Sequence, residues 1–162
     1  MNIVLIGMMG SGKTTVGKEV SKELSCKFID TDEYIEKKEQ MTLRDIIKFK
    51  GENYFRDIES EAIRVACKSS NTVISTGGGC VLKPENIKNL KENSDIWYLK
   101  CRLDMIETRI TNNSSRYLLY NTSVYDIYQE RKELYERYSD YIVDSSDKSI
   151  QDICKIIINN EL

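Results

Sequence analysis

Eight residues near the start of the chain, Gly7–Thr14, carry the spacing Gly-x4-Gly-Lys-Thr. The apolar run Ile3–Ile6 precedes them as a short buried strand, and apolar residues recur at four-residue spacing after them, as on one helix face. In this order of strand, glycine loop and helix, backbone N–H groups and the helix N-terminus point at phosphate oxygens. A plain glycine turn is the alternative, but the full spacing arises by chance in about one such chain in a hundred. The motif therefore predicts a bound nucleoside triphosphate, with Lys13 on its phosphates and Thr14 on Mg²⁺.

Composition and charge narrow the class of protein. A length of 162 residues suits one domain, and 40% hydrophobic with 31% charged residues is ordinary for a globular chain. The formal charge of −2 gives no support for nucleic-acid binding, which requires a basic excess. Because the sequence has no apolar run of about 18 residues and no leader before the first strand, we expect a cytoplasmic protein without a membrane span.

The chain has five dispersed cysteines and no histidine. Without a histidine or a Cys-x-x-Cys pair, a zinc site is not expected, and the cysteines are interpreted as small buried apolar residues. Only Cys80 stands out, because it directly follows a glycine run. The missing histidine also restricts catalysis, since a general base must then be a carboxylate, lysine, tyrosine or cysteine.

Short apolar runs alternate with segments of helical periodicity along the chain. Strands joined by helices of this size form βαβ units, which predicts an α/β fold with a parallel sheet covered on both faces. Ligands of such a sheet bind beyond the carboxyl ends of the strands, where the polar and glycine-rich clusters of this chain occur. The expected strands are Ile3–Ile6, Lys27–Ile29, Thr72–Ser75, Asp95–Leu99 and Asp140–Val143.

Two intervals are too long or too polar for a simple crossover. Residues from about 32 to 64 have helical patterns and are expected to hold two or three helices inserted after the second strand. Residues 111–123 are polar and separate two helical patterns, which predicts a lid loop over the sheet edge. No linker or repeat divides the sequence, so we expect residues 1–162 to form one domain.

Two carboxylates flank Thr31 directly after the second expected strand. In an extended segment, Asp30 and Asp32 can serve two partners, such as the Mg²⁺ shell and a substrate hydroxyl. The alternative is that these residues cap the following helix, Glu33–Lys38, because Asp and Thr favour that position. The motif alone supports both interpretations equally.

Arginines and glycines mark further candidate positions. On spacing alone Arg56 is interpreted as a solvated helix residue, although its aromatic neighbours also suit a guanidinium held for a carboxylate. The run Gly77–Gly79 follows a buried strand and favours close approach of the backbone to a ligand over a plain turn. Arg109, Arg116 and Arg131 flank the polar loop, where cations can neutralise a transferred phosphoryl group.

Taken together, these motifs resemble the shikimate kinase family in order and spacing, over almost the whole chain. The resemblance implies an adenylate-kinase-like P-loop fold of three α/β/α layers, with a five-stranded parallel sheet, a helical substrate-binding insert and a lid. It also implies transfer of the ATP γ-phosphate to the 3-hydroxyl of shikimate, within chorismate and aromatic amino-acid synthesis. The matching segments are Gly7–Thr14, Phe28–Asp32, Gly51–Arg56 with Glu59, Gly77–Gly79, Arg116–Leu119 and Arg131–Tyr135.

The resemblance further implies a role for each matching residue. Catalysis would involve Lys13, Asp32 and Arg116, with Asp32 as the group that accepts the hydroxyl proton. Mg²⁺ would be held by Thr14 and, through water, by Asp30. The shikimate contacts would be Asp32, Arg56, Gly78, Gly79 and Arg131, the two arginines on the carboxylate. The ATP contacts would be Gly10, Ser11, Gly12, Lys13, Thr14, Thr15, Arg109 against adenine and Arg116 on the γ-phosphate.

The chain departs from the family pattern at three positions. Tyr117 replaces the proline that usually follows the lid arginine, which removes a rigid φ restraint. A glycine usual near Gln40 is absent, and Ile47 stands where phenylalanine is common. None of these changes removes a residue that carries chemistry.

Four alternative functions stand beside the kinase of shikimate. One of them, a nucleoside or nucleotide kinase, is weakened by the short chain, which leaves little room for a second nucleotide site. A gluconate kinase shares the phosphate loop and a polyhydroxy acid substrate, and a non-catalytic nucleotide-binding module would keep the fold without turnover. A GTPase switch would need an Asn-Lys-x-Asp motif, which the sequence lacks. We expect a monomer whose partner is a small molecule.

Overall fold

Five parallel strands form one sheet in the order β2-β3-β1-β4-β5, in a computed structural model that describes residues 1–112 and 122–161. All five expected strands are present, so the predicted α/β fold with a parallel sheet is confirmed. Only the third strand has the expected bounds, and the other four differ by one residue at one or both ends. Asp140, expected in the last strand, precedes it, and its carboxylate accepts a hydrogen bond from the Ile96 N–H at 2.9 Å. The strands are β1 (Asn2–Ile6), β2 (Lys27–Asp30), β3 (Thr72–Ser75), β4 (Ser94–Lys100) and β5 (Tyr141–Asp144).

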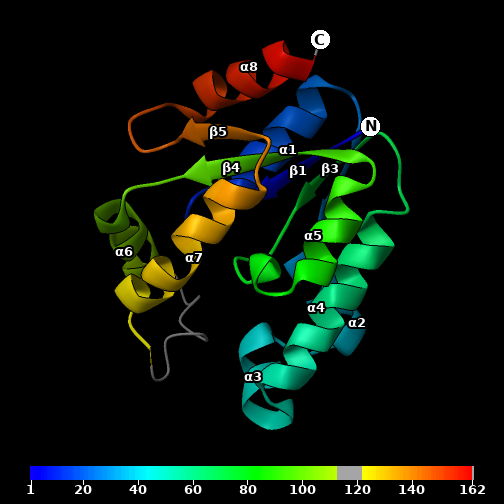
Figure 1. The fold of residues 1–162 in the computed structure, drawn as a ribbon, viewed down its shortest axis with the longest axis vertical. Coiled ribbons are helices and arrows are strands. Elements are labelled where there is room, and N and C mark those ends of the chain that lie inside the picture. The colour runs from blue at the N-terminus through cyan, green and yellow to red at the C-terminus, as the bar shows by residue number, and fades with distance from the viewer. Residues whose placement is uncertain (113–121, 162) are drawn as a thin grey trace.

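Helices cover both faces of the sheet and make the three layers (Figure 1). Helices α1 and α8 pack on one face, while α4, α5, α6 and α7 supply buried side chains to the other. The helices are α1 (Lys13–Glu23), α2 (Thr31–Glu39), α3 (Leu43–Lys50), α4 (Glu52–Ala66), α5 (Pro84–Lys91), α6 (Leu103–Asn112), α7 (Val124–Tyr138) and α8 (Ile150–Glu161), with a 3₁₀ turn η1 (Cys80–Leu82).

Strand β1 lies in the middle of the sheet, and this position explains its apolar run. Ile3 and Leu5 face the layer of α1 and α8, and Val4 and Ile6 face the opposite layer. A strand buried on both faces needs apolar residues at every position rather than at alternate ones. The phosphate loop that follows β1 is therefore anchored in the most buried part of the fold.

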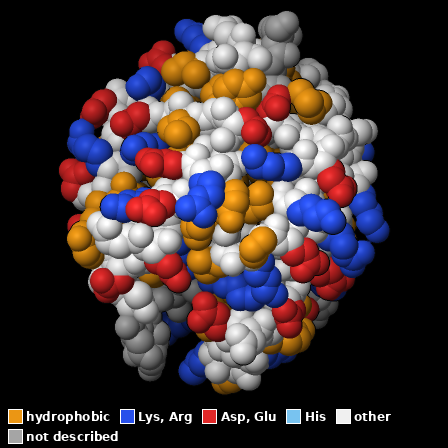
Figure 2. Space-filling model, viewed as in Figure 1, with side chains coloured by type: hydrophobic (Ala, Val, Ile, Leu, Met, Phe, Trp, Pro, Cys, Tyr) orange, Lys and Arg blue, Asp and Glu red, His pale blue; other side chains and the backbone are white. Residues whose placement is uncertain are grey.

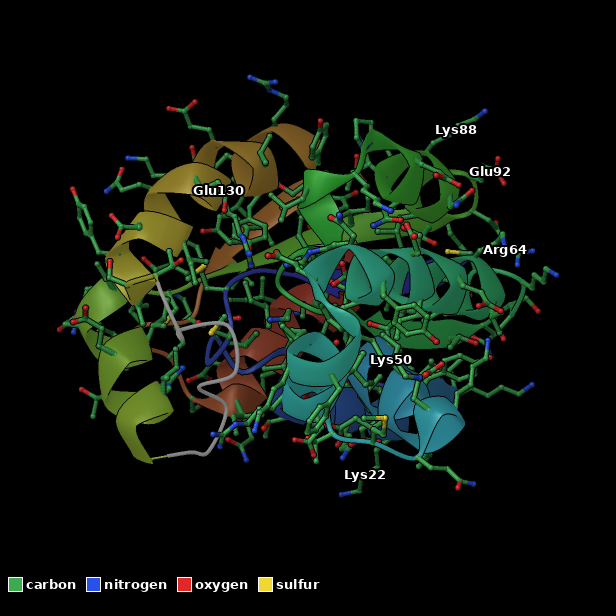
Figure 3. All side chains as sticks on the ribbon, turned by 90° about the horizontal axis from the view of Figure 1, so that it is seen from below. Lys22, Lys50, Arg64, Lys88, Glu92 and Glu130 are labelled. Carbon is green, nitrogen blue, oxygen red and sulfur yellow. The ribbon has the colours of Figure 1, made fainter. Side chains whose placement is uncertain are left out.

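The segment after β2 forms the expected helical insert, with three helices. Helices α2, α3 and α4 enclose a small core of their own, which includes Ile35, Ile46 and Phe55. Gln40 ends α2 with φ of 52°, in the left-handed region where glycine is favoured. Lys50, the last residue of α3, pairs with Glu39 of α2 at 2.7 Å and so links two helices of the insert (Figure 3).

The expected lid, residues 111–123, falls almost entirely outside the described residues, and so do Arg116 and Tyr117. Within the described ranges, no helix is long and apolar enough to cross a bilayer. Acidic and basic side chains are interspersed on the face shown in Figure 2, with no large area of one sign, which agrees with the small net charge.

Candidate active site

The phosphate loop between β1 and α1 is curled around the side chain of Lys13. Gly12 caps α1 with φ of 95°, a left-handed conformation that glycine adopts without strain. The buried Lys13 Nζ donates hydrogen bonds to the carbonyls of Gly7 and Met8, both at 2.8 Å. Burial lowers the pKa of Lys13, and the carboxylate of Asp32 opposes that effect. Two backbone oxygens thus hold the ammonium group inside the loop.

Asp30 has two contacts in the structure: it caps α2, as one of the two interpretations expected, and it binds a hydroxyl beside the phosphate loop. Its Oδ1 accepts hydrogen bonds from the N–H groups of Asp32 and Glu33, at 3.0 and 3.3 Å, and so caps α2. Its Oδ2 accepts a hydrogen bond of 2.7 Å from the Thr14 hydroxyl on α1. The cap fixes the carboxylate against the phosphate loop, so the two contacts support one another.

Asp32 is a carboxylate without a hydrogen-bond partner for one oxygen. Its Oδ1 is buried and unpaired among the described residues. Burial, followed by the nearby carboxylates of Asp30 and Glu59, raises the pKa of Asp32 to about 7, while Lys13 opposes the shift. A carboxylate that titrates near neutral pH suits a general base.

Arg56 is buried, so its interpretation as a solvated residue was wrong. Only 7% of the residue is exposed, and its Nη1 lies 2.8 Å from Glu59 Oε2 while Nη2 lies 3.3 Å from Glu52 Oε1. Its Nε has no hydrogen-bond partner in the part of the chain that the structure describes. The guanidinium is therefore held in place by two glutamates, and its Nε donor is still unused.

The glycine run after β3 leaves room for these charged side chains. A Cβ on Gly79 would overlap the Arg56 guanidinium, and one on Gly77 would come within 2.7 Å of Asp32 Oδ1 and 2.8 Å of Glu59 Oε1. Spacing alone predicted close approach of a ligand here. The structure shows in addition that Arg56 and Asp32 occupy the space beside the backbone.

Arg131 lies on α7, a helix that packs against the η1 turn after the glycine run and is separate from the insert helices (Figure 1). The residue is 3% exposed, and its Nε and Nη1 have no hydrogen-bond partner among residues 1–112 and 122–161. The nearest carboxylate is Glu130, whose Oε2 lies 3.6 Å from Arg131 Nε. A buried guanidinium with free donors is suited to an anionic ligand.

A cavity of about 620 Å³ opens along the phosphate loop. It reaches Asp32 and Gly78, whereas Arg56, Gly79 and Arg131 are not among its described lining residues. The predicted site residues that line it are Gly10, Ser11, Gly12, Lys13, Thr14, Thr15, Asp30, Asp32, Gly78 and Arg109. The structure therefore joins the nucleotide residues to Asp32 directly, and to the two arginines through the glycine run.

The sequence analysis missed one wall of this cavity. Ser145, Lys148, Ile150 and Ile153 line it from the loop after β5 and the start of α8. They form no motif, but the rule that ligands bind beyond the carboxyl ends of parallel strands would have indicated the loop after the fifth strand.

Two further residues have clear positions. Arg109 on α6 lies beside the phosphate loop and donates a hydrogen bond of 2.9 Å to the Gly10 carbonyl. Cys80 is fully buried, donates to the Thr76 hydroxyl at 3.2 Å, and burial raises its pKa to about 12. A thiol with that pKa does not serve as a base at neutral pH, which excludes Cys80 from that role.

The fold and the site together define a P-loop kinase of a small molecule. A phosphate loop follows β1, carboxylates follow β2, and the buried guanidinium of Arg56 lies beside the glycine run after β3. The family model described as shikimate kinase matches residues 9–160. This chain belongs to the shikimate kinase family. It is thus an ATP-using phosphotransferase that acts on an alcohol group.

Individual relatives agree with this membership. The chain is 42% identical to a shikimate kinase of Caldanaerobacter subterraneus over 97% of this chain and 94% of the relative. It is 43% identical to that of Clostridium botulinum, over 98% of each chain. A solved shikimate kinase of Acinetobacter baumannii in complex with shikimate superimposes with a TM-score of 0.92 and 29% identity, over 99% of this chain and 94% of that one. A deoxyadenosine kinase of M. mycoides, at 17% identity and a TM-score of 0.67, shares the fold.

Proposed function

We propose that this site transfers the γ-phosphate of ATP to the 3-hydroxyl of shikimate, giving shikimate 3-phosphate and ADP. The observation that carries the proposal is the set of buried, unpaired polar atoms on Asp32, Arg56 and Arg131. Buried polar atoms without partners are costly, and a ligand with one carboxylate and several hydroxyls supplies partners for all three. The complex of the A. baumannii relative with shikimate supports this choice.

The donor half of the reaction takes place on the phosphate loop. The backbone of Gly10–Thr15 and the start of α1 are proposed to bind the phosphates of ATP, with Lys13 on the transferred group. Ser11 carries a buried hydroxyl oxygen without a hydrogen-bond partner among the described residues, which a phosphate oxygen can satisfy. Arg109, beside Gly10, is proposed to stack on the adenine.

Mg²⁺ is proposed to be held by the Thr14 hydroxyl and, through water, by Asp30. Their oxygens lie 2.7 Å apart at the phosphate loop, and hydroxyl and carboxylate oxygens are the ligands that Mg²⁺ prefers. The ion, when bound, would neutralise charge on the β- and γ-phosphates. Removal of divalent cations with EDTA is expected to abolish turnover, and turnover that persists in EDTA would contradict this assignment.

The acceptor half positions shikimate between the insert and α7. Arg56 and Arg131 are proposed to bind its carboxylate, and the backbone of Gly78 and Gly79 to contact the ring substituents. Asp32, with its pKa near 7, is proposed to hydrogen-bond the reacting hydroxyl and to accept its proton as the phosphoryl group arrives.

Arg116 is proposed to contact the γ-phosphate from the lid. Its motif, Arg116-Tyr117-Leu118-Leu119, supports the assignment. Because such a contact forms mainly in the transition state, Arg116→Ala is expected to lower kcat more than it raises the KM for shikimate. An effect confined to KM would instead place Arg116 in ground-state binding.

We propose that the enzyme works as a single-domain monomer in the cytoplasm. The five cysteines are unpaired, as expected in a reducing compartment. Sedimentation at micromolar concentration is expected to give the mass of one chain, 18.8 kDa. A larger species that alone is active would overturn this proposal.

The function is tested by a coupled ADP-release assay with ATP, Mg²⁺ and three acids: shikimate, quinate and gluconate. Shikimate is expected to be the best substrate by kcat/KM, and Lys13→Ala is the inactive control. Preference for gluconate would support the alternative kinase, and no turnover of any acid would support a non-catalytic module.

A further inference from the structure

The Tyr135 hydroxyl connects three parts of the site that are distant in sequence. Tyr135 lies one helical turn after Arg131 on α7 and is fully buried. Its hydroxyl donates a short hydrogen bond to the Gly78 carbonyl and lies 3.8 Å from Met8 Sδ in the phosphate loop. One side chain thereby contacts the glycine run and the phosphate loop from the helix that bears Arg131.

The Tyr135 ring has little freedom to move away from this position. It stacks on the Tyr98 ring of β4, with centroids 5.1 Å apart and an angle of 25° between the planes. Burial raises the pKa of Tyr135 far above its ordinary value, so the hydroxyl stays protonated and remains a donor. The sheet therefore fixes the ring, and the ring fixes the hydroxyl.

We propose that Tyr135 is a positioning residue that sets the distance between Arg131 and the Gly77–Gly79 run. Gly78 lies between Gly77, which abuts Asp32, and Gly79, which abuts Arg56. A shift of Gly78 relative to α7 changes the separation of the two guanidinium groups that receive the carboxylate. This inference rests on the proposed function, because it concerns the same acceptor pocket.

The test is Tyr135→Phe, which keeps the ring and removes the hydroxyl. The KM for the acid is expected to rise about tenfold, the effect of one lost buried hydrogen bond, while the KM for ATP changes less than about twofold. Tyr98→Phe is the matched control, since it removes the hydroxyl from the other ring of the stack. Among the described residues, the Tyr98 hydroxyl has no hydrogen bond to the glycine run. Its KM for the acid is expected to stay within about twofold of the wild type.

A purely structural role predicts different results. If the role were only structural, Tyr135→Phe would have a lower melting temperature, and its two KM values would be either unchanged or raised equally. Either result would overturn the proposal. In the background of Arg131→Ala, where there is no guanidinium left to align, Tyr135→Phe is expected to change the KM for the acid less than about threefold. An undiminished tenfold effect in that background would also contradict it.

The substrate in these measurements is whichever of shikimate, quinate and gluconate the wild type phosphorylates best. A wild type that prefers gluconate would refute the proposed substrate, yet Tyr135→Phe would still report on the positioning of that acid. Failure of the proposed function and failure of the positioning role are thus separate results.

Discussion

The donor and acceptor halves of the site satisfy their polar groups in opposite ways. In the donor half, Lys13 binds two backbone carbonyls, and Thr14 binds Asp30, which also caps a helix. In the acceptor half, Arg56 and Arg131 each keep buried donors without hydrogen-bond partners among the described residues. The donor half is largely complete without its ligand, whereas the acceptor half requires a ligand of particular charge.

This contrast separates general from specific recognition. A phosphate loop binds many nucleoside triphosphates because it uses backbone N–H groups and one lysine. We propose that the acceptor pocket selects its substrate because a ligand lacking the carboxylate would leave buried guanidinium groups unpaired. Substitutions in the two halves should therefore give different kinetic signatures.

Removal of Lys13 is the largest expected change, since it affects the transferred group itself. Lys13→Ala is expected to lower kcat about 10³-fold, because a preorganised cation at the developing charge is lost. Fixed-time product assays at saturating ATP and acid measure this change in kcat. Lys18→Ala is the control, because Lys18 lies on the exposed side of the same helix. A drop below tenfold for Lys13→Ala would place the lysine outside the chemical step.

Removal of Arg131 should affect the acceptor half alone. Arg131→Ala is expected to raise the KM for shikimate about 10²-fold with the KM for ATP largely kept, because a buried charged partner of the carboxylate is lost. Steady-state kinetics with each substrate varied in turn separate the two constants. Arg137→Ala, on the exposed side of α7, is the control. Equal changes in both KM values would mean that the halves are not independent.

A methyl group on Gly79 is expected to weaken shikimate binding because it would displace the Arg56 guanidinium. The added Cβ overlaps the guanidinium, whereas φ of −90° at Gly79 allows any residue, so strain in the backbone does not contribute. Gly79→Ala is expected to raise the KM for shikimate about tenfold. Gly78→Ala offers a comparison, since its Cβ would meet neighbours only at 3.4 Å. An equal or larger effect at Gly78 would contradict the role given to Arg56.

The buried Asp32 carboxylate of the acceptor half is expected to lower the stability of the folded protein at high pH. Because folding raises its pKa from 3.8 to about 7, the folded state binds the proton more tightly than the unfolded chain. The resulting stability is complete below about pH 4 and is lost as the pH rises through about 7. Asp32→Asn is thus expected to lose catalysis yet raise the melting temperature at pH 8 by a few degrees, at roughly 2–4 °C per kcal/mol. A gain at pH 5 as large as that at pH 8 would contradict the shifted pKa.

The donor half could be predicted from the sequence because its chemistry lies in contiguous residues. Eight residues after β1 specify the loop, and alternating strands and helices specify the sheet. The acceptor half depends on contacts between segments far apart in sequence. The partners Glu52 and Glu59 of Arg56 are local, but its burial depends on distant segments such as Gly79, so its local sequence looked solvated. The Tyr135–Gly78 hydrogen bond spans 57 positions.

The account depends most on the claim that the acceptor half recognises a carboxylate. The direct measurement is kcat/KM of the wild type and of Arg131→Ala for shikimate and for its methyl ester, at saturating ATP and Mg²⁺. The wild type is expected to prefer the free acid by about 10²-fold or more, and Arg131→Ala to lose most of that preference. Equal turnover of acid and ester by the wild type would contradict the account.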